Sequence, residues 1–64
     1  MTADEALAKL SEWARAREVA IETMGGALFV SVGESGSPVR LFGGDGPTLI
    51  EAIEAAALGE SEAK

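Results

Sequence analysis

The residues best suited to bind a ligand lie between Arg40 and the start of an apolar helical pattern. After Phe42 the chain reads Gly43-Gly44-Asp45-Gly46-Pro47-Thr48. A glycine-rich loop that leads into a helix exposes backbone N–H groups, which can hold an anion. The Arg40 guanidinium can add a bidentate contact to a phosphate, and the Asp45 carboxylate can accept from a ribose hydroxyl or a base. This segment therefore predicts a site for a small anionic nucleotide, with an ordinary strand-to-helix turn as the alternative.

Trp13 and Arg17 are a second pair of candidate ligand-binding residues. They lie one helical turn apart in a stretch with helical periodicity. An exposed indole ring can act as a stacking platform for a base. Packing in the core or at its rim is the alternative for Trp13.

Catalytic side chains are scarce. The chain has no histidine, cysteine or tyrosine, so the commonest general acid–base residue and a thiol nucleophile are both missing. The usual zinc ligand sets are excluded for the same reason. Ser35 lacks the spacing of a nucleophile elbow, and Glu51 and Glu54 are typical of a solvated helix face. We therefore expect a protein that is not an enzyme and uses no cofactor or metal.

Two β-rich runs on either side of Gly25-Gly26 organise the chain. They span about 18–24 and 27–32, and Gly-Gly suits a two-residue hairpin turn because both residues can take positive φ. The register of this hairpin places three pairs on one face of the sheet: Val19–Val32, Ile21–Val30 and Thr23–Leu28. In the alternative interpretation, the preceding helical pattern continues to Met24 and stops at Gly25.

Two amphipathic helices are expected, at about 3–16 and 48–58. Each begins with a capping box, Thr2 with Glu5 and Thr48 with Glu51. Apolar residues recur at helical spacing on one side of each helix. In the first helix these residues are Ala3, Ala6, Leu7, Leu10, Trp13 and Ala14, and in the second they are Leu49, Ile50, Ile53, Ala56 and Ala57. Gly59 is expected to end the second helix, and residues 60–64 are expected to be frayed.

A third strand is expected at about 39–42, after the turn-rich segment 33–38. If Val32 pairs with Val39, then Val30 lies opposite Leu41 on the helix-covered face. The sequence thus predicts an α+β fold of order α-β-β-β-α, in which a three-stranded antiparallel meander carries two helices on one face. Residues 1–64 are expected to form a single domain.

The same register leaves Phe29 and Phe42 side by side on the uncovered face of the sheet. Glu22 and Arg40 flank them. An exposed aromatic pair on a sheet is typical of an interface, with cover by a loop or by the C-terminal tail as the alternative. The candidate interface residues are Met24, Phe29, Phe42, Glu22 and Leu58.

Composition limits the class of partner. A chain of 64 residues without cysteine has a small core and no disulfide, which favours self-association. The net charge of −6 disfavours nucleic acid as a partner.

No apolar run approaches the roughly 20 residues of a membrane span, and no signal peptide is recognised. We therefore expect a cytoplasmic homo-oligomer.

Two resemblances to known families add to these expectations. The order α-β-β-β-α resembles that of double-stranded-RNA-binding domains, although Glu51 and Glu54 stand where those domains are basic. The stretch Gly44-Asp45-Gly46-Pro47-Thr48-Leu49-Ile50-Glu51-Ala52 is similar to Gly-Asp-Thr-Leu-Glu-Glu-Ala in HicB-type antitoxin domains, where a strand ends and a helix begins. This second resemblance implies an antitoxin-like partner of a small toxin. The chain also resembles small acidic proteins that phages encode.

These features predict a small, non-catalytic binding protein that acts as a homo-oligomer through protein–protein interaction. Two alternatives remain open. One is a phage accessory protein that sequesters a small anionic nucleotide, and the other is the antitoxin-like partner of a toxin.

Overall fold

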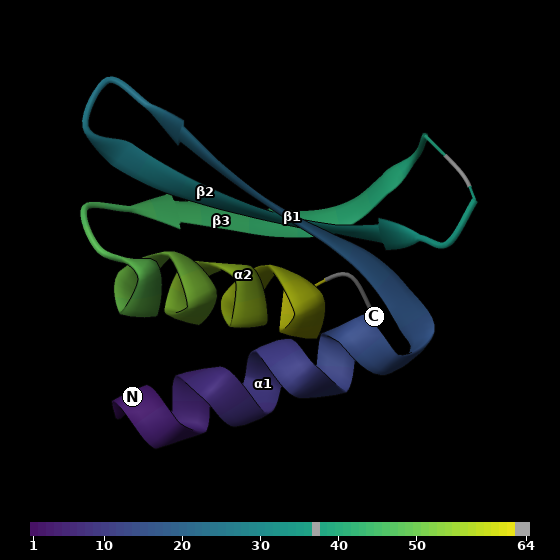
Figure 1. Ribbon diagram of the computed structural model, residues 1–64, viewed down its shortest axis with the longest axis horizontal. Helices are drawn as coiled ribbons and strands as arrows, with labels where there is room; N and C mark the ends of the chain where they lie inside the picture. Colours follow the sequence, from purple (N-terminus) through teal and green to yellow (C-terminus); the bar gives the residue numbers. More distant parts are fainter. Residues whose placement is uncertain (37, 63–64) are drawn as a thin grey trace.

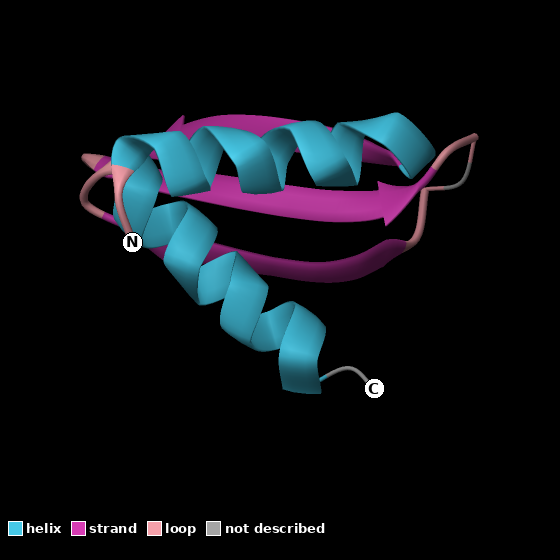
Figure 2. Ribbon diagram, turned by 90° about the horizontal axis from the view of Figure 1, so that it is seen from below, coloured by secondary structure: helices cyan, strands magenta, loops and turns pink. Residues whose placement is uncertain are grey.

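The computed structural model describes residues 1–36 and 38–62 of the chain. Its elements occur in the predicted order: α1 (Ala3–Ala16), β1 (Arg17–Met24), β2 (Ala27–Glu34), β3 (Arg40–Gly46) and α2 (Leu49–Glu62). The strands form one antiparallel sheet of order β1-β2-β3, and both helices lie on the same side of it (Figure 1, Figure 2). The predicted α+β architecture is confirmed. The side of the sheet that carries the helices is called the inner face below, and the opposite side is called the outer face.

The β1–β2 hairpin has the predicted turn and register. Gly25 and Gly26 have φ angles of 57° and 85°, the positive values of a type I′ turn. The three pairs Val19–Val32, Ile21–Val30 and Thr23–Leu28 are all present. The alternative of a helix continuing to Met24 is wrong, because α1 ends at Ala16 and Arg17 is already extended, with φ −142° and ψ 166°.

The register between β2 and β3 differs from the prediction. Val32 lies opposite Phe42, not Val39, and Gly33 lies opposite Arg40. Leu41 is therefore the extra, unpaired residue of a β-bulge in β3. A bulge adds a residue to one strand, and sequence alternation does not mark where it occurs. As a result Phe42 lies on the inner face and is 8% exposed, whereas Leu41, predicted to be buried, is exposed.

The segment predicted as a glycine-rich loop is largely strand. β3 extends to Gly46, well past the expected end at residue 42, and only Pro47 and Thr48 connect it to α2. A side chain at Gly44 would collide with the backbone nitrogen of Ala56, and one at Gly46 would lie 2.8 Å from the Glu51 Cβ. Glycine in a strand often marks such a close approach of another backbone. These glycines therefore serve helix–sheet packing.

The C-terminal helix is also longer than expected. The prediction that it stops at Gly59 is wrong, because α2 continues to Glu62. A Cβ at Gly59 would lie 3.2 Å from the Gly43 carbonyl oxygen, so this glycine lets the helix pass close to β3. Residues 60–62 of the expected frayed tail are helical, and residues 63–64 lie outside the described residues.

Both helices begin at the predicted threonines. At α1 the Glu5 N–H donates to the Thr2 hydroxyl at 3.2 Å, and the Thr2 N–H donates to the Glu5 carboxylate at 2.9 Å, which completes a capping box. At α2 the Glu51 N–H donates to the Thr48 hydroxyl at 3.2 Å. Within the described residues, neither helix combines the length and the apolar character needed to cross a membrane.

The core is small and lies between α2 and the centre of the sheet, with Trp13 closing it from α1. Its buried residues are Ala6, Trp13, Val30, Val32, Phe42, Ala52, Ile53 and Ala56. The hairpin tip rises away from the helices (Figure 1). Ile21 is 48% exposed although it lies on the inner face, and Leu7 of α1, which was expected to be buried, is 61% exposed.

Candidate functional site

The outer face of the sheet consists of residues aligned in rows across the strands. A row of small side chains, Ala20, Ser31 and Gly43, crosses the middle of the sheet. The next row towards the β2–β3 loop is Glu18, Gly33 and Arg40, and the next row towards the hairpin tip is Glu22, Phe29 and Asp45. The small central row leaves this face hollowed between two charged rows.

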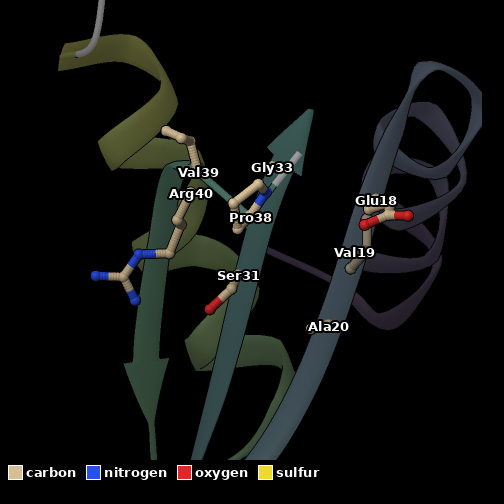
Figure 3. Close-up of a pocket in the computed structure, with 8 residues that line it drawn as sticks. All are labelled: Glu18, Val19, Ala20, Ser31, Gly33, Pro38, Val39 and Arg40. Atoms are coloured by element: carbon tan, nitrogen blue, oxygen red, sulfur yellow. The ribbon is translucent and has the colours of Figure 1, made fainter. Parts of the chain in front are cut away.

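The larger hollow on this face has a volume of about 410 Å³. Ser31 and Gly33 of the middle strand lie between Arg40 on one side and Glu18 on the other (Figure 3). Pro38 and Val39 close the end formed by the β2–β3 connection. The hollow is open and shallow, and its charges lie at its two sides, a shape that suits contact with another surface.

Part of the predicted nucleotide site comes together in a smaller hollow of about 160 Å³. Phe29, Arg40, Gly43 and Asp45 line it, together with Gly44. However, these residues belong to strands. The glycines expected to form a loop belong instead to β3, which runs to Gly46, and the Thr48 hydroxyl accepts from the Glu51 N–H at the start of α2.

The remaining members of the predicted nucleotide site lie elsewhere. Gly44 and Gly46 face α2, whose backbone occupies the space beside them. Trp13 belongs to the inner-face core, on the opposite side of the sheet from Arg40. Within one protomer the predicted ligand residues therefore do not form a single pocket, and nucleotide binding stays a prediction.

Trp13 is fully enclosed and cannot serve as a stacking platform. The side chain is 2% exposed, and its ring meets the Phe42 ring edge-on, with centroids 5.4 Å apart and planes at 66°. Lys9 Nζ lies 5.8 Å from the indole centroid, and the Arg17 guanidinium carbon lies 5.5 Å from the Phe42 centroid. An edge-on ring contact and two cation–π contacts thus hold this aromatic pair in place.

Glu60 completes this cluster, and its role was not foreseen in the sequence. Its Oε2 accepts a hydrogen bond from the Trp13 indole nitrogen at 3.0 Å and lies 3.5 Å from an Arg17 guanidinium nitrogen. Its Oε1 lies 3.1 Å from Lys9 Nζ. Burial raises the pKa of Glu60, but the hydrogen bonds from Lys9 and Trp13 and the charges of Lys9 and Arg17 outweigh it, so the pKa falls below its ordinary value of 4.5. The Glu60 carboxylate therefore has a structural role, because its contacts hold α2 against Trp13, Lys9 and Arg17.

The predicted aromatic pair on the outer face is wrong. Phe42 lies in the core against Trp13, because the bulge at Leu41 reverses the faces of β3. Phe29 does lie on the outer face, half-buried and opposite Asp45. The other candidate interface residues, Glu22, Met24 and Leu58, are exposed.

Several apolar side chains that sequence reasoning assigned to the inside are on the surface. The exposed large apolar residues are Met1, Leu7, Ile21, Met24, Val39, Leu41, Leu49 and Leu58. Leu7, Leu49 and Leu58 belong to the helices, Ile21 and Met24 to the hairpin and Leu41 to β3, whereas Met1 and Val39 lie outside these elements. A periodicity signal shows which side of an element is apolar, but it does not show that another element covers that side.

Among the described residues, no cluster of three or more acidic side chains is arranged to hold a metal ion. No protein-family model, curated protein or solved structure matches the chain. The resemblances to double-stranded-RNA-binding domains and to HicB-type antitoxins therefore consist of element order and one short stretch.

Proposed function

We propose that the chain is a non-catalytic binding protein that acts as a homo-oligomer through protein–protein contacts. The observation that carries this proposal is an imbalance between surface and core. Among the described residues, eight large apolar side chains are exposed, while the core of eight residues includes three alanines and five larger side chains. Association that covers even some of these side chains would remove from water apolar surface that the small core leaves exposed.

The size of the chain supports the same conclusion. A domain of about 60 residues buries only about 60% of the surface of its unfolded chain and is marginally stable. The chain has no cysteine with which to form a disulfide. Burial of exposed apolar side chains between subunits would supply stability that the monomer core lacks.

The charge distribution favours a protein partner over nucleic acid. The chain carries a net charge of −6. In the part of the chain that the structure describes, the rows of the outer face contain Glu18, Glu22 and Asp45 and the guanidinium of Arg40. A phosphate backbone would meet repulsion on this face.

Native mass spectrometry together with sedimentation velocity, across the micromolar range, tests the proposal. We expect a dimer or larger oligomer of the intact chain, with dissociation on dilution. A monomer over the whole range would overturn the proposal. A co-purifying nucleotide mass on a monomer would instead support the sequestration alternative.

A further inference from the structure

β1 lies at one edge of the sheet. Within residues 1–36 and 38–62, the strand order β1-β2-β3 leaves one edge of β1 and one edge of β3 without a partner strand. β3 carries a bulge at Leu41 and three glycines, which are features that discourage edge pairing. β1 is eight residues long and contains no proline, glycine or lysine, and its register with β2 runs without a break. Such a strand is a ready template for pairing with another chain.

The turn geometry identifies which main-chain groups lie on this free edge. In a type I′ turn the closing residues, here Met24 and Ala27, are hydrogen-bonded to each other. Hydrogen-bonded and non-hydrogen-bonded pairs alternate along an antiparallel ladder. The N–H and C=O groups of Val19, Ile21 and Thr23 therefore point away from β2, towards the free edge.

We propose that a second copy of this chain pairs its β1 antiparallel with this β1, about a twofold axis through Ile21. The proposal rests on the homo-oligomer proposed above and specifies its contact. The product is a continuous six-stranded sheet with the helices of both copies on one face. Antiparallel pairing keeps inner residues opposite inner residues, so the half-exposed Ile21 side chains of the two copies meet on the inner face.

Charge and length together favour this register over its neighbours. A twofold axis at Ala20 would place Glu18 opposite Glu22 twice, and an axis at Glu22 would place that glutamate opposite itself. An axis at Val19 allows only five residues to pair, because the chain is helical up to Ala16. Acidic residues directly opposite each other destabilise a strand pair, so all three of these registers are disfavoured by charge or by length.

With the axis at Ile21, seven residues pair and no acidic residue faces another. Glu18 lies opposite Met24, Val19 opposite Thr23, and Ala20 opposite Glu22. The partner strand ends opposite Glu18, just short of the junction between α1 and β1. In this register Glu18 and Glu22 therefore each lie opposite an uncharged residue of the other copy.

Single-cysteine variants test the register, because the chain has no cysteine of its own. A residue on the twofold axis meets its own copy at about 5.5 Å between Cα atoms, within disulfide range. We expect Ile21→Cys to form a disulfide-linked dimer under mild oxidation. Ala20→Cys is the matched control, because its copy lies two residues away in this register. Preferential cross-linking of Ala20→Cys would overturn the proposal.

A proline variant tests the use of the edge without cross-linking. Proline is tolerated in an edge strand where the lost N–H faces solvent. Thr23→Pro should keep the circular dichroism spectrum of the fold but raise the dimer dissociation constant about tenfold or more, since two symmetric hydrogen bonds are lost. The control is Leu58→Ser, which removes an exposed apolar side chain of α2 and should leave the constant unchanged.

The outcomes separate this inference from the function on which it rests. A monomeric wild type overturns both. A wild-type dimer that Thr23→Pro leaves intact, or that Leu58→Ser dissociates, overturns the edge contact while homo-oligomerisation stands.

Discussion

At the scale of single residues, Glu60 links the two helices to the aromatic core. Its carboxylate satisfies the indole N–H of Trp13 and also faces Lys9 and Arg17. Trp13 is the largest fully buried side chain, and a buried N–H without a partner is costly. One acidic residue near the end of α2 therefore allows an indole to be buried.

Glu60→Ala should lower the free energy of unfolding by about 1–3 kcal/mol, since it leaves the Trp13 N–H unpaired. Urea denaturation monitored by tryptophan fluorescence measures this change. Glu62→Ala removes the same charge from an exposed position on the same helix and should change stability by less than about 0.5 kcal/mol. Equal effects of the two variants would contradict the role given to Glu60.

The same contacts predict a pH dependence. The pKa of Glu60 is lower in the folded chain than its ordinary value, so the stabilisation by its charge is fully present above the ordinary glutamate pKa. It is lost as the pH falls through the lowered pKa of the folded state. The stability difference between wild type and Glu60→Gln, measured by urea denaturation, should therefore shrink on acidification. A difference that is constant with pH would show that the charge of Glu60 contributes nothing.

At the scale of elements, the contact between β3 and α2 determines the shape of the molecule. The glycines of β3 let the helix backbone lie directly on the strand, and the alanines of α2 face the same contact. The helices cover β1 unevenly: Val19 packs against the core, whereas Ile21, nearer the hairpin tip, is 48% exposed.

Gly44→Ala should be severely destabilising, by at least about 3 kcal/mol or to the point of unfolding, because its Cβ would overlap the backbone of Ala55 and Ala56. Thermal unfolding measured by circular dichroism tests this. Gly36→Ala is the control, because a Cβ there meets nothing within 4 Å, and only the positive φ of 78° costs about 1–2 kcal/mol. A Gly44→Ala variant as stable as Gly36→Ala would show that α2 can move away from β3.

At the scale of the whole molecule, acidity opposes the association that exposed apolar surface favours. Each copy carries a net charge of −6, so two copies repel each other at a distance. In the proposed β1 contact no acidic residue lies directly opposite another, but the overall repulsion between the two copies remains.

Raising the salt concentration should therefore strengthen the oligomer. Screening between about 50 and 500 mM salt should lower the dissociation constant several-fold, because long-range repulsion is reduced while apolar and main-chain contacts persist. Sedimentation velocity at both salt concentrations measures this change in the dissociation constant. Dissociation at high salt would instead indicate an interface that depends on ion pairs.

The sequence by itself determined what depends on neighbouring residues. Positive φ at Gly25 and Gly26, alternation on either side of them, and threonine caps three residues before a glutamate are local features, and the hairpin register and both helix starts followed from them. The order of elements and the α+β class follow from the same signals.

Only the tertiary structure decided the register of β3, the burial of Phe42 and the partner of Trp13. A bulge at Leu41 has no local signature, and glycines that suit a loop equally suit a strand beneath a helix. Trp13 and Glu60 are 47 residues apart, and no periodicity connects positions so distant. These long-range contacts determine which residues stay exposed to a partner, because burial depends on how the elements pack.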